Sequence, residues 1–358
     1  MADRQMTKPS ISEGACCPLP LPHLSQIVLG HGSGGRMTQS LIESTFYPEL
    51  GNPLLLQRDD SAVVELDDGS RWAFTTDAHI VSPLFFPGGD IGRLAVCGTV
   101  NDLAMVGAVP RWLSATFILE EGLLRSDLVR IVQSMKAAAE EAGVWLVAGD
   151  TKVAERGKCD RVFITTSGWG QIPAGRNVSG GQAQPGDVVI VSGTMGDHGV
   201  AVLAARGDLA FESDLPSDVA PLNGLVEAMF AAGSGIRVLR DPTRGGLTGA
   251  LHAICQQSQV GIEIHELDVP IAPSVAAACE MLGFDPLYIA NEGKLVAIVE
   301  PAQAPAILSA MRGHAYGAQA RQIGTVTEAD PGRLVLRTSI GSRRALEPMA
   351  GEMLPRIC

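Results

Sequence analysis

The sequence contains few aromatic residues and no excess of positive charge. Phe, Trp and Tyr together make up 4% of its 358 residues, and the formal net charge is −12 at pH 7. Proteins that bind nucleic acid present a basic surface to the phosphates, and those that bind single strands stack the bases on aromatic rings. We therefore expect no nucleic-acid partner. A single nucleotide stays compatible with this charge, because one loop or a metal ion can bind its phosphates locally.

The chain also lacks an apolar stretch of the signal-peptide kind at its start and a run long enough to span a membrane. Its seven cysteines include no Cys-x-x-Cys pair, so neither a zinc site nor a disulfide framework is indicated. Free thiols fit a reducing compartment. We therefore expect a cytoplasmic protein with no membrane partner, and its cysteines are Cys16, Cys17, Cys97, Cys159, Cys255, Cys279 and Cys358.

Apolar residues, by contrast, are plentiful at 46%, which is ample material for packed cores. A length of 358 residues suggests two domains. Strand-like and helix-like segments intermingle in both halves without a steady strand–helix–strand rhythm, which favours an α+β fold over a doubly wound sheet. We predict a flexible extension over residues 1–22, an N-terminal domain over 23–170, a C-terminal domain over 171–338 and a flexible tail over 339–358.

Three segments of the first half have clear periodicity. Apolar residues recur at helical spacing over 91–108, which predicts a helix that carries Asp102. A second helix is predicted over 123–142, where a glycine follows as the C-terminal stop. The run VWLVAGD at 144–150 predicts a buried strand that ends on Asp150.

Two glycine-rich stretches have to be separated from better-known phosphate-binding motifs. Residues 29–37, LGHGSGGRM, predict a loop around Ser33 whose backbone can approach a ligand closely. It is not a P-loop, since Gly-x-x-x-x-Gly-Lys-Ser/Thr occurs nowhere in the chain. Residues 193–199, GTMGDHG, do not have the spacing of a dinucleotide fingerprint, so we expect a tight turn into a helix. For His31 and His198, which lie in these stretches, the sequence leaves open a structural hydrogen bond or a contact to phosphate or a partner.

Aspartates recur at expected strand ends, on a helix and in turns. Each one alone is readily explained as a helix cap or a turn former. Beside several glycine loops they together suggest a magnesium–nucleotide site, because Mg²⁺ takes hard oxygen ligands and commonly bridges substrate phosphates. The motifs are RDDSA, TTDA, VNDLAM, LRDPTRGG and AGDTK, which supply Asp59, Asp60, Asp77, Asp102, Asp241 and Asp150.

The last residue of the sequence is Cys358. A chain end is usually solvated and tolerant of change, so a chance cysteine is the simplest interpretation of this position. A prenylation signal is excluded, because that motif places the cysteine fourth from the end.

The order of these motifs resembles the aminoimidazole ribonucleotide synthetase-like superfamily, also called PurM-like. The resemblance extends from about His31 to the end of the chain. The segments PLFFPGGDIGRLAVCGT and AGDTKV and the final PRIC are similar to one branch in particular, the HypE family of hydrogenase maturation proteins. This resemblance implies a two-domain α+β fold and a homodimer in which the N-terminal domains bind ATP and pair into a β-barrel.

The resemblance also implies a set of site residues. The metal–phosphate positions of the family, which hold Mg²⁺ and ATP, correspond to Asp60, Asp77, Asp102 and Asp241. The glycine loop that closes over the phosphates corresponds to Gly32, Ser33, Gly34 and Gly35. Further neighbours of the nucleotide correspond to Asp59, Asp150, Thr151 and Lys152. The catalytic candidates are Cys358, Glu292 and Lys152.

The activity implied is a carbamoyl dehydratase that helps make the cyanide ligand of nickel–iron hydrogenase. The carbamoyltransferase HypF would load a carbamoyl group onto Cys358, and ATP would dehydrate this thiocarbamate to a thiocyanate. The nitrile carbon would then pass to iron on a HypC–HypD scaffold. Phosphorylation makes chemical sense here because it turns a poor leaving group, the amide oxygen, into phosphate. Lys152 would stabilise charge on the phosphoryl group, and Glu292 would accept protons from the amide.

Two alternatives remain open from the sequence. One is a selenophosphate synthetase-like or other ATP-dependent synthetase of the same superfamily. We expect a selenophosphate synthetase to carry a reactive cysteine and a lysine in its N-terminal glycine loop, and the loop at 29–37 contains neither residue. The other is a non-catalytic scaffold that binds ATP as a structural cofactor.

Overall fold

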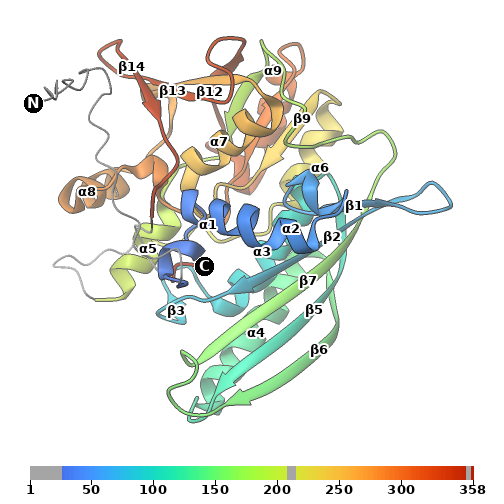
Figure 1. Ribbon diagram of the computed structural model, residues 1–358, viewed down its shortest axis with the longest axis vertical. Helices are drawn as coiled ribbons and strands as arrows, with labels where there is room; N and C mark the ends of the chain where they lie inside the picture. Colours follow the sequence, from blue (N-terminus) through green and yellow to red (C-terminus); the bar gives the residue numbers. More distant parts are fainter. Residues whose placement is uncertain (1–25, 208–214, 352–355) are drawn as a thin grey trace, which may run out of the picture.

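The computed structural model describes residues 26–207, 215–351 and 356–358, and most strands of this part of the chain belong to two sheets (Figure 1). The extension predicted over 1–22, with Cys16 and Cys17, lies outside the described residues. The mixture of strands and helices in both halves confirms the prediction of an α+β fold.

The first sheet has five strands in the order β1-β2-β7-β5-β6. Neighbouring strands are antiparallel except for β5 and β6, which run parallel. Side chains alternate along β7 between buried and partly exposed positions, as expected for a sheet with one face on a core. The strands are β1 (Ala62–Glu65), β2 (Arg71–His79), β5 (Val109–Glu120), β6 (Trp145–Ala154) and β7 (Val162–Ile172).

The second sheet has seven strands in the order β14-β13-β10-β12-β8-β11-β9. Two of its interior strands, β8 and β11, are wholly apolar and wholly buried, as expected when both faces of a sheet are covered. The strands are β8 (Val188–Val191), β9 (Ile236–Arg240), β10 (Gly261–His265), β11 (Val296–Val299), β12 (Arg321–Thr327), β13 (Leu334–Arg337) and β14 (Arg343–Leu346). A short hairpin of β3 (Phe85–Phe86) and β4 (Gly89–Asp90) stands apart from both sheets.

Helices of the described residues cover these sheets (Figure 1). They are α1 (Arg36–Leu41), α2 (Tyr47–Leu50), α3 (Ile91–Met105), α4 (Arg125–Ala142), α5 (Asp197–Ala205), α6 (Asn223–Ala232), α7 (Gly246–Ser258), α8 (Pro273–Leu282) and α9 (Ala304–Arg312). The predicted helices over 91–108 and 123–142 are confirmed as α3 and α4, within a few residues of their ends.

Helix α3 connects the two halves of the molecule. Its side chains are nearly all buried, because it lies between the two halves and most of its residues are apolar. It contacts β2, β5, β7 and α4 of the first half, and also α6 and β9 of the second. Asp90 caps its N-terminus by accepting hydrogen bonds from the backbone amides of Gly92 (2.7 Å) and Arg93 (3.2 Å). A residue on α3 is therefore held firmly between the two sheets.

The prediction that residues 144–150 form a buried strand is wrong in one respect. The strand exists as β6, but it is the edge strand of the first sheet and its side chains are exposed. Trp145, Val147 and Val153 are 74%, 61% and 69% exposed. Asp150 lies inside the strand and not at its end. An apolar run in the sequence does not show whether the strand is buried in the core of its own chain or exposed at its surface.

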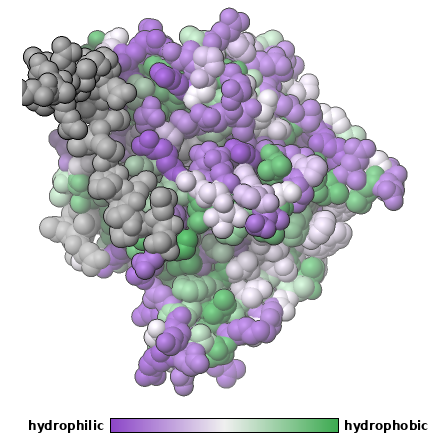
Figure 2. Space-filling model, in the orientation of Figure 1, coloured by the Kyte–Doolittle hydropathy of each residue, from purple (hydrophilic) through white to green (hydrophobic). Residues whose placement is uncertain are grey.

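The other tryptophans lie on the same sheet. Trp72 of β2 and Trp112 of β5 stack with ring centroids 5.8 Å apart and an interplanar angle of 7°. Trp169 of β7 packs beside Phe74 and is 46% exposed. Figure 2 shows hydrophobic side chains at the surface in the lower part of the view, where Figure 1 shows this sheet.

The predicted flexible tail over 339–358 contains ordered structure. Arg343–Leu346 form β14, which pairs with β13 as the last strand of the second sheet, so the prediction is wrong for these residues. The backbone oxygen of Met349 then accepts a hydrogen bond from the amide of Arg36 (2.9 Å). Residues 356–358 return to the junction between the two halves, where Figure 1 marks the C-terminus near α5. None of the helices in the described ranges is both long and apolar enough to cross a membrane.

Candidate active site

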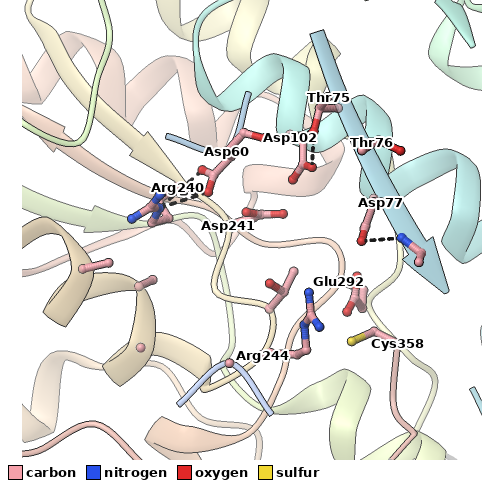
Figure 3. Close-up of a pocket in the computed structure, with 17 residues that line it drawn as sticks. Asp60, Thr75, Thr76, Asp77, Asp102, Arg240, Asp241, Arg244, Glu292 and Cys358 are labelled. Atoms are coloured by element: carbon pink, nitrogen blue, oxygen red, sulfur yellow. Dashed lines mark hydrogen bonds and ion pairs between the residues drawn. The ribbon is translucent and has the colours of Figure 1, made fainter. Parts of the chain in front are cut away.

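A cavity of about 350 Å³ lies where the two halves of the molecule meet. Its walls come from segments that are far apart in the sequence, and Figure 3 shows their side chains converging on one space. Asp60 precedes β1, Asp77 belongs to β2, Asp102 to α3, and Asp241 follows β9. The structure thus brings together all four aspartates that the sequence analysis assigned to metal–phosphate positions.

Three of these aspartates have a polar neighbour that orients them. Thr75 donates a hydrogen bond to Oδ2 of Asp102 (2.9 Å). Arg240 pairs with Asp60, with Nη2 3.0 Å from Oδ1. Nε2 of the buried His79 lies 3.2 Å from Oδ2 of Asp77.

The crowding of these carboxylates changes their acidity. Burial, followed by the charges of Asp241, Asp77 and Asp60, raises the pKa of Asp102 well above its usual value. Burial and the charge of Asp60 raise the pKa of Asp241 to about 8. Asp77 is different, because His79 and Arg244 outweigh the effect of burial and lower its pKa to about 2. So many carboxylates at one cavity are stable only if protons or cations compensate them.

Cys358 lines the same cavity, opposite the aspartates. In Figure 3 its sulfur lies near both Glu292 and the guanidinium of Arg244. Burial and then the charge of Glu292 raise the pKa of the Cys358 thiol, while Arg244 opposes them. Burial and the surrounding carboxylates likewise raise the pKa of Glu292 well above its usual value. Within the described residues, Oε1 of Glu292 is buried without a hydrogen-bond partner.

The glycine loop lies at the entrance to this region. Gly34 lines the cavity, and Gly32 and Ser33 line a neighbouring space of about 210 Å³ that Cys358 also borders. Gly34 has a positive φ of 77°, and a Cβ added there would lie 2.7 Å from Cβ of Arg244. Gly35 packs so closely on Met349 that no side chain fits there. The loop and the segment that leads to Cys358 are therefore in direct contact.

The remaining predicted nucleotide neighbours do not line the cavity. Asp59 accepts a hydrogen bond from the backbone amide of Gly180 (2.8 Å) and faces away from the site. Asp150, Thr151 and Lys152 are exposed on β6, where Nζ of Lys152 lies 2.8 Å from Oδ2 of Asp150. Within a single chain, Lys152 is thus separated from Cys358 and Glu292, the two catalytic candidates that the structure brings together.

Two arginines of the site were not singled out from the sequence. Arg240 and Arg244 both belong to LRDPTRGG, the motif from which only Asp241 was chosen. A signal was present, because a cavity that collects several carboxylates needs cations, and these arginines flank one of the aspartates. Arg244 is the more informative, since it interacts electrostatically with Cys358, Asp77 and Glu292.

The acidic side chains of the cavity can be compared with the ligands that a metal ion requires. No group of three or more His, Cys, Asp or Glu side chains in the described part of the chain is arranged to hold a metal alone. Mg²⁺ rarely needs such a group, because it keeps waters and is usually bound by one or two carboxylates together with substrate phosphates. The crowded aspartates, two of them with raised pKa values, fit a divalent cation that arrives with phosphate.

Comparison with protein families gives two matches that cover most of the chain. Residues 58–172 match the AIR synthase related protein N-terminal domain, and residues 184–337 match the C-terminal domain of the same family. A carbamoyl dehydratase HypE from Cupriavidus necator is 54% identical over 333 residues, which cover 93% of this chain and 95% of that protein. The HypE of Azotobacter vinelandii is 55% identical over 329 residues, or 92% of this chain and 96% of that protein.

Solved structures agree with these matches. A HypE–HypF complex contains a chain that is 49% identical, with a TM-score of 0.82, covering 87% of this chain and 100% of that one. A hydrogenase maturation protein HypE in complex with ATP is 47% identical, with a TM-score of 0.78, covering 93% and 100%. A thiamine monophosphate kinase from Aquifex aeolicus, 19% identical with a TM-score of 0.65 and covering 87% and 100%, is similar in fold alone.

Proposed function

Because the chain belongs to the AIR synthase related family and, within it, to the HypE carbamoyl dehydratases, we propose that Cys358 carries the carbamoyl group that this protein dehydrates. The protein acts in hydrogenase maturation as a carbamoyl dehydratase. One observation above all supports the role of Cys358. Its side chain lines the same cavity as the four aspartates and Glu292.

ATP would place its phosphates in this cavity, as the relative solved with ATP suggests. Asp60, Asp77, Asp102 and Asp241 would hold Mg²⁺ with those phosphates, and the ion would supply neutralising charge for phosphoryl transfer. The loop of Gly32, Ser33, Gly34 and Gly35 would close over them with its backbone amides, because it already borders the cavity. Asp59 is held by Gly180 and would act on the phosphates only after that bond breaks.

The reaction would proceed in two steps. First, the carbamoyl oxygen attacks the γ-phosphorus, the bond to ADP breaks and the nitrogen loses one proton. Then the carbon–oxygen bond breaks, phosphate leaves with the former carbamoyl oxygen, the nitrogen loses its second proton and the nitrile forms. Glu292 would accept a proton, since its buried carboxylate is a strong base once deprotonated. Arg244 would stabilise negative charge beside the sulfur.

The protein would work as a homodimer in which the first sheets of two copies pair into a β-barrel. The exposed apolar side chains of β6 support this, because single chains rarely leave such a surface uncovered. Asp150, Thr151 and Lys152 of one copy would then approach the phosphates in the cavity of the other. Lys152 would serve catalysis across this interface, which accounts for its distance from the cavity of its own chain.

Two partners follow from this chemistry. HypF would load the carbamoyl group, as the complex solved for a relative suggests, and HypC–HypD would receive the nitrile carbon on iron. Cys358 would have to leave the cavity for both encounters, because its side chain lines the cavity between the two halves of the molecule.

Mass spectrometry of the peptide that carries Cys358 tests this proposal. The protein is incubated with HypF, carbamoyl phosphate and ATP, and the peptide should gain a carbamoyl mass and then lose the mass of water. Cys358→Ala should abolish both changes and leave ATP binding intact, because the aspartates remain. Carbamoyl label on another peptide would contradict the proposal.

A further inference from the structure

The segment 356–358 is held in place through its backbone. The amide of Ile80 donates a hydrogen bond to the oxygen of Cys358 (3.1 Å), and the amide of Ser82 donates to the oxygen of Arg356 (3.2 Å). This is the spacing of a short antiparallel pairing, which leaves the oxygen of Ile357 pointing to the other side. Arg206 adds a bridge, because it donates to the oxygens of both Ser82 (2.9 Å) and Arg356 (2.8 Å).

The oxygen of Ile357 meets a fully buried histidine. Nε2 of His198, near the start of α5, lies 2.8 Å from this oxygen. A carbonyl oxygen can only accept, so Nε2 carries the hydrogen and Nδ1 is the acceptor. The hydroxyl of Ser217 lies 2.8 Å from Nδ1 and donates to it. The same hydroxyl accepts a hydrogen bond from the amide of Val219 (3.1 Å), so the orientation of the hydroxyl is fixed in turn.

The ring of His198 is also fixed by packing. It stands edge-on to Phe86, with centroids 5.5 Å apart and an interplanar angle of 86°. Burial lowers the pKa of His198, which keeps the ring neutral and preserves this arrangement of donor and acceptor. The imidazole is thus a rigid donor aimed at one backbone oxygen of the segment that ends at Cys358.

We propose that His198 is a positioning residue that places the Cys358 thiol in the carboxylate-lined cavity by binding the backbone oxygen of Ile357. The inference rests on the proposed function, because it concerns the side chain that carries the substrate. His198 binds the backbone oxygen of Ile357 and not the sulfur. The same hydrogen bond can therefore form whether the Cys358 side chain is a thiol, a thiocarbamate or a thiocyanate. When the segment leaves the cavity, Nε2 loses its acceptor inside a buried site, which favours the docked position.

The reactivity of Cys358 toward N-ethylmaleimide in the full chain tests this role. The rate is followed by mass spectrometry of the peptide that carries Cys358, which separates it from the other cysteines. His198→Phe keeps an aromatic ring but removes the donor, and should raise the rate at least tenfold. His198→Gln can place an amide N–H near the position of Nε2 and should restore most of the protection. His252→Phe, in a partly buried histidine of α7 that lines a separate depression, should leave the rate unchanged.

A second measurement follows one turnover of carbamoylated protein with ATP. His198→Phe should slow dehydration at least tenfold, while ATP binding and loading by HypF stay near the wild-type level.

Alkylation of folded His198→Phe at the wild-type rate would overturn the inference. If His198→Phe does not fold, His198→Asn replaces it, because its amide reaches Ser217 but not Ile357. Equal rates for the Asn and Gln variants would then also overturn it. Absence of dehydration in the wild type would count against the proposed function alone, since the alkylation result does not depend on turnover.

Discussion

At the scale of single residues, the cavity holds five acidic side chains and two arginines. The two arginines have different surroundings. Arg240 is paired with Asp60 and also donates to the oxygen of Arg58, so it serves to hold the wall of the cavity together. Within the described residues Arg244 forms no ion pair and donates to the backbone oxygen of Gly32 (3.3 Å), and its charge acts on Cys358, Asp77 and Glu292. It is the cation best placed to act on a group bound to the sulfur.

Arg244→Met should therefore reduce turnover about a hundredfold, the usual effect of removing one donor that stabilises developing charge. ATP binding should change much less, because the aspartates are intact. Single-turnover dehydration and calorimetric ATP binding measure the two effects. Arg321→Met, which removes an exposed arginine paired with Asp268, is the matched control. Wild-type turnover in Arg244→Met would show that its charge plays no part in the chemistry.

At the scale of helices and strands, one of the polar clusters that hold α3 against its surroundings is centred on Glu141. Nη1 of Arg93 on α3 lies 2.7 Å from Oε2 of Glu141 on α4. The hydroxyl of Tyr316, in the second half of the molecule, donates to the other oxygen of Glu141. The bonds from Arg93 lower the pKa of Glu141, although burial opposes them. This cluster joins α3, α4 and the segment before β12, and so supports the helix that carries Asp102.

Glu141→Gln should destabilise the protein at neutral pH by less than about 1 kcal/mol, because the pair is partly exposed. The folded pKa of Glu141 lies below its unfolded value, so its contribution is complete above that unfolded value. It is lost as the pH falls through the folded pKa, because the unfolded state then binds more protons. The gap between variant and wild type in urea unfolding should therefore close as the pH is lowered.

Glu140→Gln is the matched control for this measurement. Its carboxylate is exposed and lies 3.6 Å from Lys136, so its removal should leave the unfolding curve nearly unchanged at every pH. A gap for Glu141→Gln that stays constant with pH would contradict an ionic contribution.

The sequence predicts site residues best where a residue of the right chemical type lies in a short motif next to an expected strand, helix or turn. Asp60, Asp102 and Asp241 could be selected because each lies in a short motif beside an expected strand, helix or turn, and they do meet at one cavity. Burial was harder to predict. Strand β6 has the composition of a core strand, yet it is exposed in the single chain, because composition does not reveal which surface covers it. Arg244 and His198 were not selected because their importance depends on contacts with residues more than 100 positions away.

At the scale of the whole molecule, the two halves contribute different parts of the site. The first half supplies Asp60, Asp77 and Asp102, and the second supplies Asp241 and Glu292. The cavity therefore exists only when both halves are packed together around α3. Strand β6 is the last strand in the order of the first sheet, so one of its edges is unpaired within that sheet. Its apolar side chains are exposed. Under the proposed function, catalysis would take place at the junction and self-association at the β6 edge.

Val147→Glu, on β6, should convert the proposed dimer to a monomer, because it places a charge on the apolar surface that the second copy would cover. Sedimentation velocity measures the change in mass. Turnover should fall with it, since Lys152 of the second copy would no longer reach the phosphates. Leu267→Glu, at a position 72% exposed outside the first sheet, should leave both the mass and the turnover unchanged. A Val147→Glu protein of unchanged mass would refute an interface at β6.

The placement of the tryptophans offers a practical means of observing these events. All four residues, Trp72, Trp112, Trp145 and Trp169, belong to the five-stranded sheet, and the seven-stranded sheet has none. Intrinsic fluorescence is therefore a local probe of the first half, whereas far-ultraviolet circular dichroism averages over both. If the emission maximum and the dichroism change at different denaturant concentrations, the two halves lose their structure separately. Quenching by iodide would in addition report whether Trp145 becomes shielded as the protein concentration rises.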